Sequence, residues 1–164
     1  GHPDMNRKYL TLASRIKAEL SDIKAVVKRI TGGWERLRTT GDDYYLDSVA
    51  LNLHTFYSAL EKIFTLIATN VDGAMPEGPS WHQDLLIQMK GEIKNIRPAV
   101  LSQETCQMLD EYRAFRHVVR NVYAFNLSYD KIAPLVNNIE TLFTRLKKEM
   151  GQFVRFIEEA GESS

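Results

Sequence analysis

Cysteine is almost absent from this sequence, since Cys106 is the only one among 164 residues. A lone cysteine cannot form an internal disulfide, which excludes the class of small secreted domains held by disulfide frameworks. The chain also lacks a net charge, because 21 lysines and arginines balance 21 aspartates and glutamates. A protein without net charge has no overall electrostatic attraction for nucleic acid or an anionic membrane. Any such binding must therefore come from a local cluster of charges.

Long hydrophobic runs are missing as well. No apolar run reaches the length of a membrane span, and no secretory signal is visible. The sequence therefore predicts a soluble protein that is located in the cytoplasm. Residues 1–5, GHPDM, resemble the remnant of a cleaved tag ahead of a start at Met5, so His2 is left out of the functional argument. The length predicts one helical domain over residues 6–160, followed by a polar tail at 161–164.

Apolar residues recur at steps of three and four along most of the chain, which is the spacing of amphipathic helices. No strand-like alternation of useful length is present. Gly32 and Gly33 are expected to end the first helix, and Ser80 to cap the third. The pattern predicts an all-α, up-and-down bundle of about five helices, over about 9–30, 43–71, 80–93, 102–119 and 132–157.

The segment RHVVRNVY, residues 116–123, gathers basic and polar side chains on one helix. At 100° per residue, one wall of that helix carries apolar side chains and the other carries basic and polar ones. The apolar wall consists of Phe115, Val118, Val119 and Val122, and the basic-polar wall of Arg113, His117, Arg120 and Asn121. Guanidinium groups bind phosphate oxygens, so this wall is a candidate RNA surface. The spacing alone fits an ordinary solvated helix face equally well.

Other familiar sites are missing. His54 is interpreted as a satisfied, partly buried histidine, and His82 as a packing and capping residue at a helix start. No pair of histidines has metal-ligand spacing with a carboxylate, and Cys106 has no partner, so neither a metal nor a cofactor is expected.

Residues 116–123 resemble the R-x4-6-H motif of the HEPN superfamily, and more narrowly the R-x4-H-x-Y form of HepT-like toxins of HEPN/MNT toxin-antitoxin pairs. The similarity extends to LHTFYSALEKIFTLIA at 53–68, to PSWHQDLLIQM at 79–89 and to FRHVVRNVYAFNL at 115–127. The resemblance implies a homodimer whose two motifs face one cleft and cut RNA, either tRNA or mRNA, without a metal. DNA and membranes are not expected as partners.

By similarity, Arg116 would polarise the scissile phosphate, with His117 beside it and Arg113 and Arg120 guiding the RNA backbone. The position of the family's catalytic histidine is occupied here by Asn121. An amide cannot titrate, so general acid-base catalysis at this position is lost. Three explanations are open: a natural asparagine with His117 in the acid-base role, a natural inactive member, or an engineered change that disables a toxic nuclease.

Tyr123 matches the tyrosine that an MNT-type nucleotidyltransferase antitoxin modifies with AMP in this family. Bulk and negative charge beside Arg116 and Arg120 would block the cleft. The alternative for Tyr123 is a tyrosine that caps the core at a helix end. The alternative for the whole chain is a non-catalytic helical module that keeps the HEPN scaffold to bind RNA or a partner protein.

Overall fold

The computed structural model describes residues 3–121 and 127–163, with the backbone alone at Pro3, Arg120 and Asn121. Helices make up most of the described chain, and an isolated bridge joins Ile93 to Arg97. The elements are α1 (Pro3–Thr40), α2 (Tyr44–Ile67), the π-helical turn η1 (Ala68–Asp72), α3 (Trp81–Lys90), α4 (Gln103–Asn121) and α5 (Tyr129–Glu162). The predicted all-α bundle of five helices is confirmed for this part of the chain.

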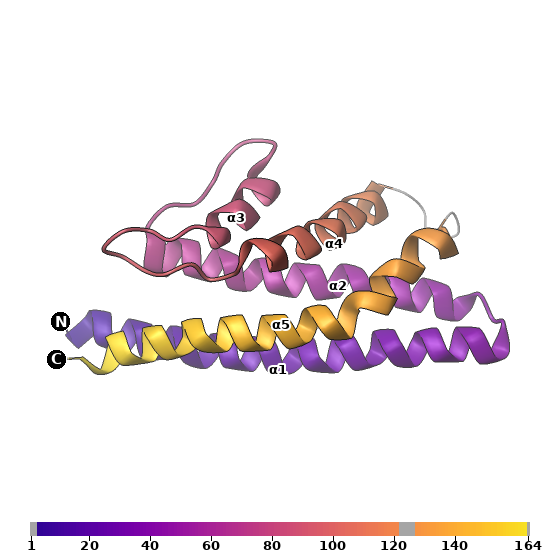
Figure 1. Cartoon of the computed structure of the whole chain (residues 1–164), viewed down its shortest axis with the longest axis horizontal. Coiled ribbons are helices and arrows are strands. Elements are labelled where there is room, and N and C mark those ends of the chain that lie inside the picture. Colours follow the sequence, from indigo (N-terminus) through magenta and orange to yellow (C-terminus); the bar gives the residue numbers. More distant parts are fainter. Residues whose placement is uncertain (1–2, 122–126, 164) are drawn as a thin grey trace.

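The two long helices α1 and α2 form an antiparallel hairpin, and α5 runs alongside α1 so that both chain ends lie at the same end of the bundle (Figure 1). The shorter helices α3 and α4 pack on α2, which therefore lies between α1 on one side and α4 on the other. This central position explains why Phe56, Tyr57, Leu60 and Phe64 of α2 are all fully buried. An element covered on two sides needs apolar residues around most of its circumference.

The expected end of the first helix at Gly32 and Gly33 is wrong, because α1 continues to Thr40. The apolar stripe also continues past the glycines, and Trp34 and Leu37 are buried against the rest of the core. Each glycine costs a helix about 1 kcal/mol relative to alanine, whereas burial of a large apolar side chain contributes about 1.5–3 kcal/mol. The chain turns instead at Gly41, which has a φ of +70°.

Two further helix boundaries differ from the sequence pattern. The third helix, expected over about 80–93, covers only Trp81–Lys90, and the side chain of Ser80 makes no capping hydrogen bond. Helix α5 begins at Tyr129, so Pro134 lies beyond its first turn. Figure 1 shows that α5 bends in this first part, as expected where proline removes a backbone donor. The expected start of α4 is confirmed, since Ser102 Oγ accepts from the Thr105 backbone N–H at 3.2 Å.

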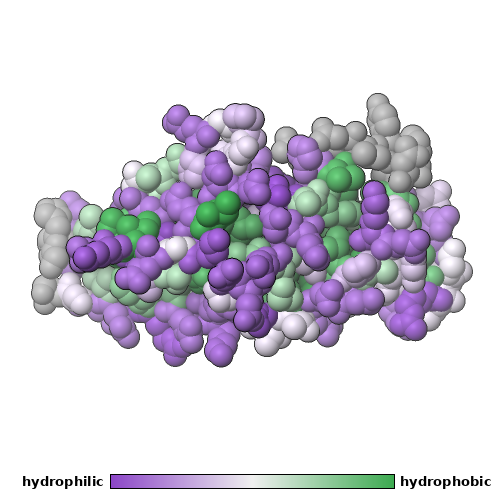
Figure 2. Space-filling model, turned by 45° about the horizontal axis from the view of Figure 1, so that its top comes forward, coloured by the Kyte–Doolittle hydropathy of each residue, from purple (hydrophilic) through white to green (hydrophobic). Residues whose placement is uncertain are grey.

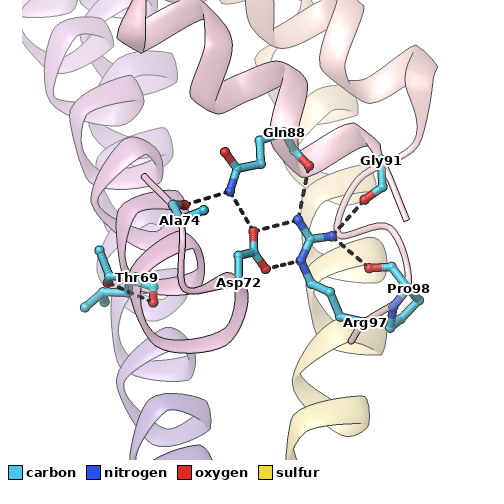
Figure 3. A network of polar contacts seen from close by, with 8 residues as sticks. Thr69, Asp72, Ala74, Gln88, Gly91, Arg97 and Pro98 are labelled. Carbon is cyan, nitrogen blue, oxygen red and sulfur yellow. Dashed lines mark hydrogen bonds and ion pairs between the residues drawn. The ribbon is translucent and has the colours of Figure 1, made fainter. Parts of the chain in front are cut away.

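A buried ion pair holds the connection that leads into α3 (Figure 3). Arg97 and Asp72 have side-chain exposures of 0% and 1%. Arg97 Nε and Nη2 donate to the two oxygens of Asp72, and the other donors of Arg97 reach the backbone carbonyl oxygens of Gln88, Gly91 and Pro98. The guanidinium thereby uses all five of its N–H donors and ties the end of η1 to the end of α3.

The two ends of the chain pack closely. A Cβ atom added to Gly161 would lie 2.9 Å from Leu10 Cγ and 3.0 Å from the backbone oxygen of Asn6. We expect Gly161→Ala to lower the free energy of unfolding by about 1–3 kcal/mol, because a backbone oxygen cannot move aside cheaply. The matched control is Gly151→Ala, where a Cβ meets nothing within 4 Å, and which should stabilise α5 by about 0.5–1 kcal/mol. Urea denaturation measures the free energy of unfolding of both variants. An equal increase in that free energy for the two variants would contradict this packing.

Candidate functional site

A hollow of about 450 Å³ lies between the start of α3 and the middle of α4. Its wall combines a glycine-proline loop, two ring side chains and a row of basic side chains from α4. The lining residues are Gly78, Pro79, Ser80, Trp81, His82, Gln83, Arg113, Arg116 and His117. The structure therefore brings three residues of the predicted site, Arg113, Arg116 and His117, to one surface.

Arg116 is the most buried of the three, with 7% of its surface exposed. Its Nη1 donates to Glu61 Oε1 at 2.9 Å and to Ser58 Oγ at 3.4 Å, both on α2. Its guanidinium also lies over the ring of Tyr57, 5.5 Å from the centroid. The Nε atom is buried and has no hydrogen-bond partner among the described residues. Arg116 is thus fixed in one position, with a buried carboxylate as its counter-ion.

Glu61 also contacts His82, through its second oxygen. His82 Nδ1 lies 2.8 Å from Glu61 Oε2 and 2.8 Å from Arg116 Nη2. The imidazole ring lies against the indole of Trp81, with 3.6 Å between the ring centroids. One buried carboxylate therefore holds both an arginine of α4 and a histidine of α3 at the hollow.

The helical-wheel prediction for α4 is partly wrong. It placed Val118 on the apolar wall, yet Val118 is 43% exposed, whereas Arg116 is buried on the same side as Phe115 and Tyr112. The buried side of α4 is therefore rotated toward Arg116. Arg116 can be buried there because of a tertiary contact. Glu61 on α2 pairs with the guanidinium, which allows it to lie beside apolar residues.

The remaining predicted residues lie differently. Arg113 is half-buried, and its Nε donates to Asp110 at 2.7 Å. His117 is exposed. Arg120 and Asn121 belong to α4 by their backbone, but their side chains lie outside the described part of the structure, and so does the whole of Tyr123. Their roles stay predictions.

Glu61 and His82 were missed as site residues from sequence. The interpretation of His82 as a capping residue is wrong, because its ring contacts Glu61 and Arg116. A usable signal was present at Glu61, which is a charged residue between Leu60 and Ile63 in the most apolar helix of the chain. A carboxylate at such a position needs a buried partner.

Two other groups that could react are held neutral by burial. Burial, and secondarily the Glu61 carboxylate, raises the pKa of Tyr57 far above its usual value, and its hydroxyl has no hydrogen-bond partner among the described residues. Burial raises the pKa of the Cys106 thiol to about 11, and its Sγ faces the Leu86 carbonyl oxygen at 3.8 Å. Neither group is a nucleophile at neutral pH.

The described residues contain no group of three or more histidine, cysteine, aspartate or glutamate side chains placed to hold a metal ion. Within the same residues, no helix combines the length and the apolar character needed to cross a bilayer.

Comparison with known proteins identifies the family of this chain. The family model described as "HepT-like protein" matches residues 48–157, which is more than half of the chain and includes α3, α4 and most of α2 and α5. Neither the curated proteins nor the solved structures contain a significant match. The matched segment spans Glu61, His82 and Arg116, and this chain belongs to the HepT-like family.

Proposed function

We propose that this protein is a HepT-like HEPN toxin, a metal-independent endoribonuclease that acts at a cleft between two copies of the chain. The observation that carries the proposal is the hollow itself, where Arg113, Arg116 and two histidine rings face one space. Guanidinium groups bind phosphate oxygens, and histidines move protons near neutral pH. These are the groups that cleavage of RNA by its own 2′-hydroxyl requires.

Arg116 is suited to stabilising charge on the scissile phosphate. Its Nη1 is held by Glu61, which leaves the guanidinium fixed at the wall of the hollow before substrate arrives. A donor that needs no reorganisation stabilises a transition state more effectively than a mobile one. In this proposal Arg113 and Arg120 guide the RNA backbone, and His117 and Asn121 stand beside the phosphate.

A second copy of the chain would complete the cleft. On the face that carries α3 and α4, apolar patches are separated by hydrophilic side chains (Figure 2). Val118, on the helix of the motif, is 43% exposed, and Ile87 of α3 is 50% exposed. Apolar side chains beside a site are a surface that a symmetric partner can cover. Sedimentation equilibrium of the chain and of Val118→Asp tests the dimer, which the charged variant should weaken.

Asn121 weakens the chain as an enzyme in this proposal, because an asparagine at the position of the family's histidine cannot transfer a proton. The assay that tests the function is cleavage of total RNA and of tRNA in EDTA by this chain, by Asn121→His and by Arg116→Ala. Cleavage that requires a divalent metal, or that persists without Arg116, contradicts it.

The antitoxin in this proposal is an MNT-type nucleotidyltransferase that transfers AMP to Tyr123. Incubation of the chain with such a partner, ATP and Mg²⁺ should add one AMP to Tyr123, seen by mass spectrometry of the peptide. The added phosphate and adenosine place negative charge and bulk where the RNA phosphate binds. Tyr123→Phe should remain unlabelled, whereas Tyr129→Phe, a change at an exposed tyrosine of α5, should be labelled normally. Equal labelling of Tyr123→Phe would refute this site.

The rival is a non-catalytic module that binds RNA or a partner protein. The observation that favours it is the ion pair between Arg116 and Glu61, which compensates the charge of the arginine within the protein. Absence of cleavage by both this chain and Asn121→His, together with retained RNA binding, would support the module.

A further inference from the structure

We propose that His82, oriented by Glu61, is the group that accepts the proton of the ribose 2′-hydroxyl in this hollow. The inference rests on the proposed ribonuclease function and assigns a catalytic role to a residue outside the R-x4-H-x-Y segment. It starts from a chemical need: Asn121 cannot take a proton, so attack by the 2′-hydroxyl requires another base.

The geometry of His82 is that of a base held by a carboxylate. Glu61 has a side-chain exposure of 8%, and its Oε2 lies 2.8 Å from His82 Nδ1. A carboxylate that accepts from Nδ1–H fixes the tautomer in which Nε2 carries the free lone pair. The imidazole is 24% exposed and lines the hollow. Contact with Trp81 holds the plane of the ring.

The contact between His82 and Arg116 makes this arrangement responsive to substrate. His82 Nδ1 lies 2.8 Å from Arg116 Nη2 as well as from Glu61. One ring nitrogen cannot donate to a carboxylate and accept from a guanidinium at the same time. A substrate phosphate that accepts from Nη2 removes the competing contact and leaves Nδ1 to donate to Glu61. Binding of the phosphate and orientation of the base are thereby coupled.

Groups that face the hollow can carry out both proton transfers of the cleavage reaction. His82 Nε2 takes the proton of the 2′-hydroxyl, and the 2′ oxygen forms a bond to phosphorus. The bond between phosphorus and the 5′ oxygen breaks, and that oxygen takes a proton from the imidazolium of His117. The products are a 2′,3′-cyclic phosphate and a 5′-hydroxyl, and exchange with water returns both histidines to their starting states. Arg116 and Arg113 hold the charge on the phosphate oxygens.

The test is single-turnover cleavage of an RNA oligonucleotide in EDTA across a range of pH, with His82→Ala, His82→Gln and, as a control, Gln152→Ala. His82→Gln can still donate to Glu61 but cannot accept a proton, so it separates the chemistry from the packing. We expect both His82 variants to lower the rate by about 10²-fold, the lower end for loss of acid-base catalysis, because His117 remains. Gln152→Ala, at an exposed position of α5 outside the hollow, should cut at the parent rate.

Two readouts distinguish a base from a structural residue. The His82 variants should lose the fall in rate toward acidic pH that protonation of the base causes, and added imidazole should restore cleavage by His82→Ala. Unchanged rates and pH profiles in both folded variants would overturn the role of His82 while leaving the ribonuclease function intact. Cleavage by Asn121→His but not by this chain would also overturn the role of His82 and leave the ribonuclease function intact. Failure of every variant to cut would overturn the function and His82 together.

Discussion

Replacement of Asn121 with histidine is expected to raise the rate of RNA cleavage by about 10²-fold, the lower end of the contribution of general acid-base catalysis, because His82 and His117 already move protons in this chain. Asn121 is the last residue of α4, five positions after Arg116. At 1.5 Å and 100° per residue, its Cα lies about 7.5 Å further along the axis and about 140° around it. An imidazole there would introduce a titrating group near the phosphate held by Arg116, where the amide supplies only hydrogen bonds.

The measurement is initial-rate cleavage of tRNA in EDTA by this chain and by Asn121→His at equal concentrations. Arg116→Ala, introduced into both backgrounds, should remove activity, because it deletes the group that stabilises the charged phosphate. Asn121→Gln is the matched control, since it changes the side chain without adding a titratable group, and it should not gain activity. Equal rates for the parent and Asn121→His would show that position 121 carries no proton transfer.

Loss of the buried ion pair between Arg97 and Asp72 is expected to cost about 3–5 kcal/mol of folding free energy. Removing the guanidinium leaves the Asp72 carboxylate buried without a counter-ion, and three backbone carbonyl oxygens each lose one donor (Figure 3). Gln88 Nε2 still donates to Asp72 at 2.8 Å but carries no charge. The pair ties the end of η1 to the end of α3, the helix that carries His82. Loss of the pair should therefore disorder the hollow as well.

Urea denaturation of Arg97→Met measures this cost. Arg38→Met is the control, because Arg38 and Glu35 form an exposed pair with 63% side-chain exposure on both partners, and such pairs contribute about 0–1 kcal/mol. The double variant Arg97→Met/Asp72→Leu should recover much of the loss, since no charge then stays buried. A loss below about 1 kcal/mol in Arg97→Met would contradict the burial of the pair.

Local periodicity was enough to predict the helices, because residues three and four apart share a helix face whatever the helix packs against. The start of α4 at Ser102 follows from capping chemistry that lies within three residues. The same local argument failed at Gly32 and Gly33. There the burial of Trp34 and Leu37 decided that α1 continues, and burial depends on α2 and α5.

The R-x4-H-x-Y resemblance and the family membership were readable in the sequence, since they depend on residue types at fixed spacings along the chain. The surroundings of Arg116 were not. Glu61 lies 55 positions before it and His82 lies 34 positions before it, so only the packing of α2 and α3 on α4 brings them together. A wheel drawn on one helix contains no information about the partner of a buried charge. Residue types and their spacing along the chain are enough to predict the helices and the family, whereas the carboxylate and the histidine that meet Arg116 follow from the packing of α2 and α3 on α4.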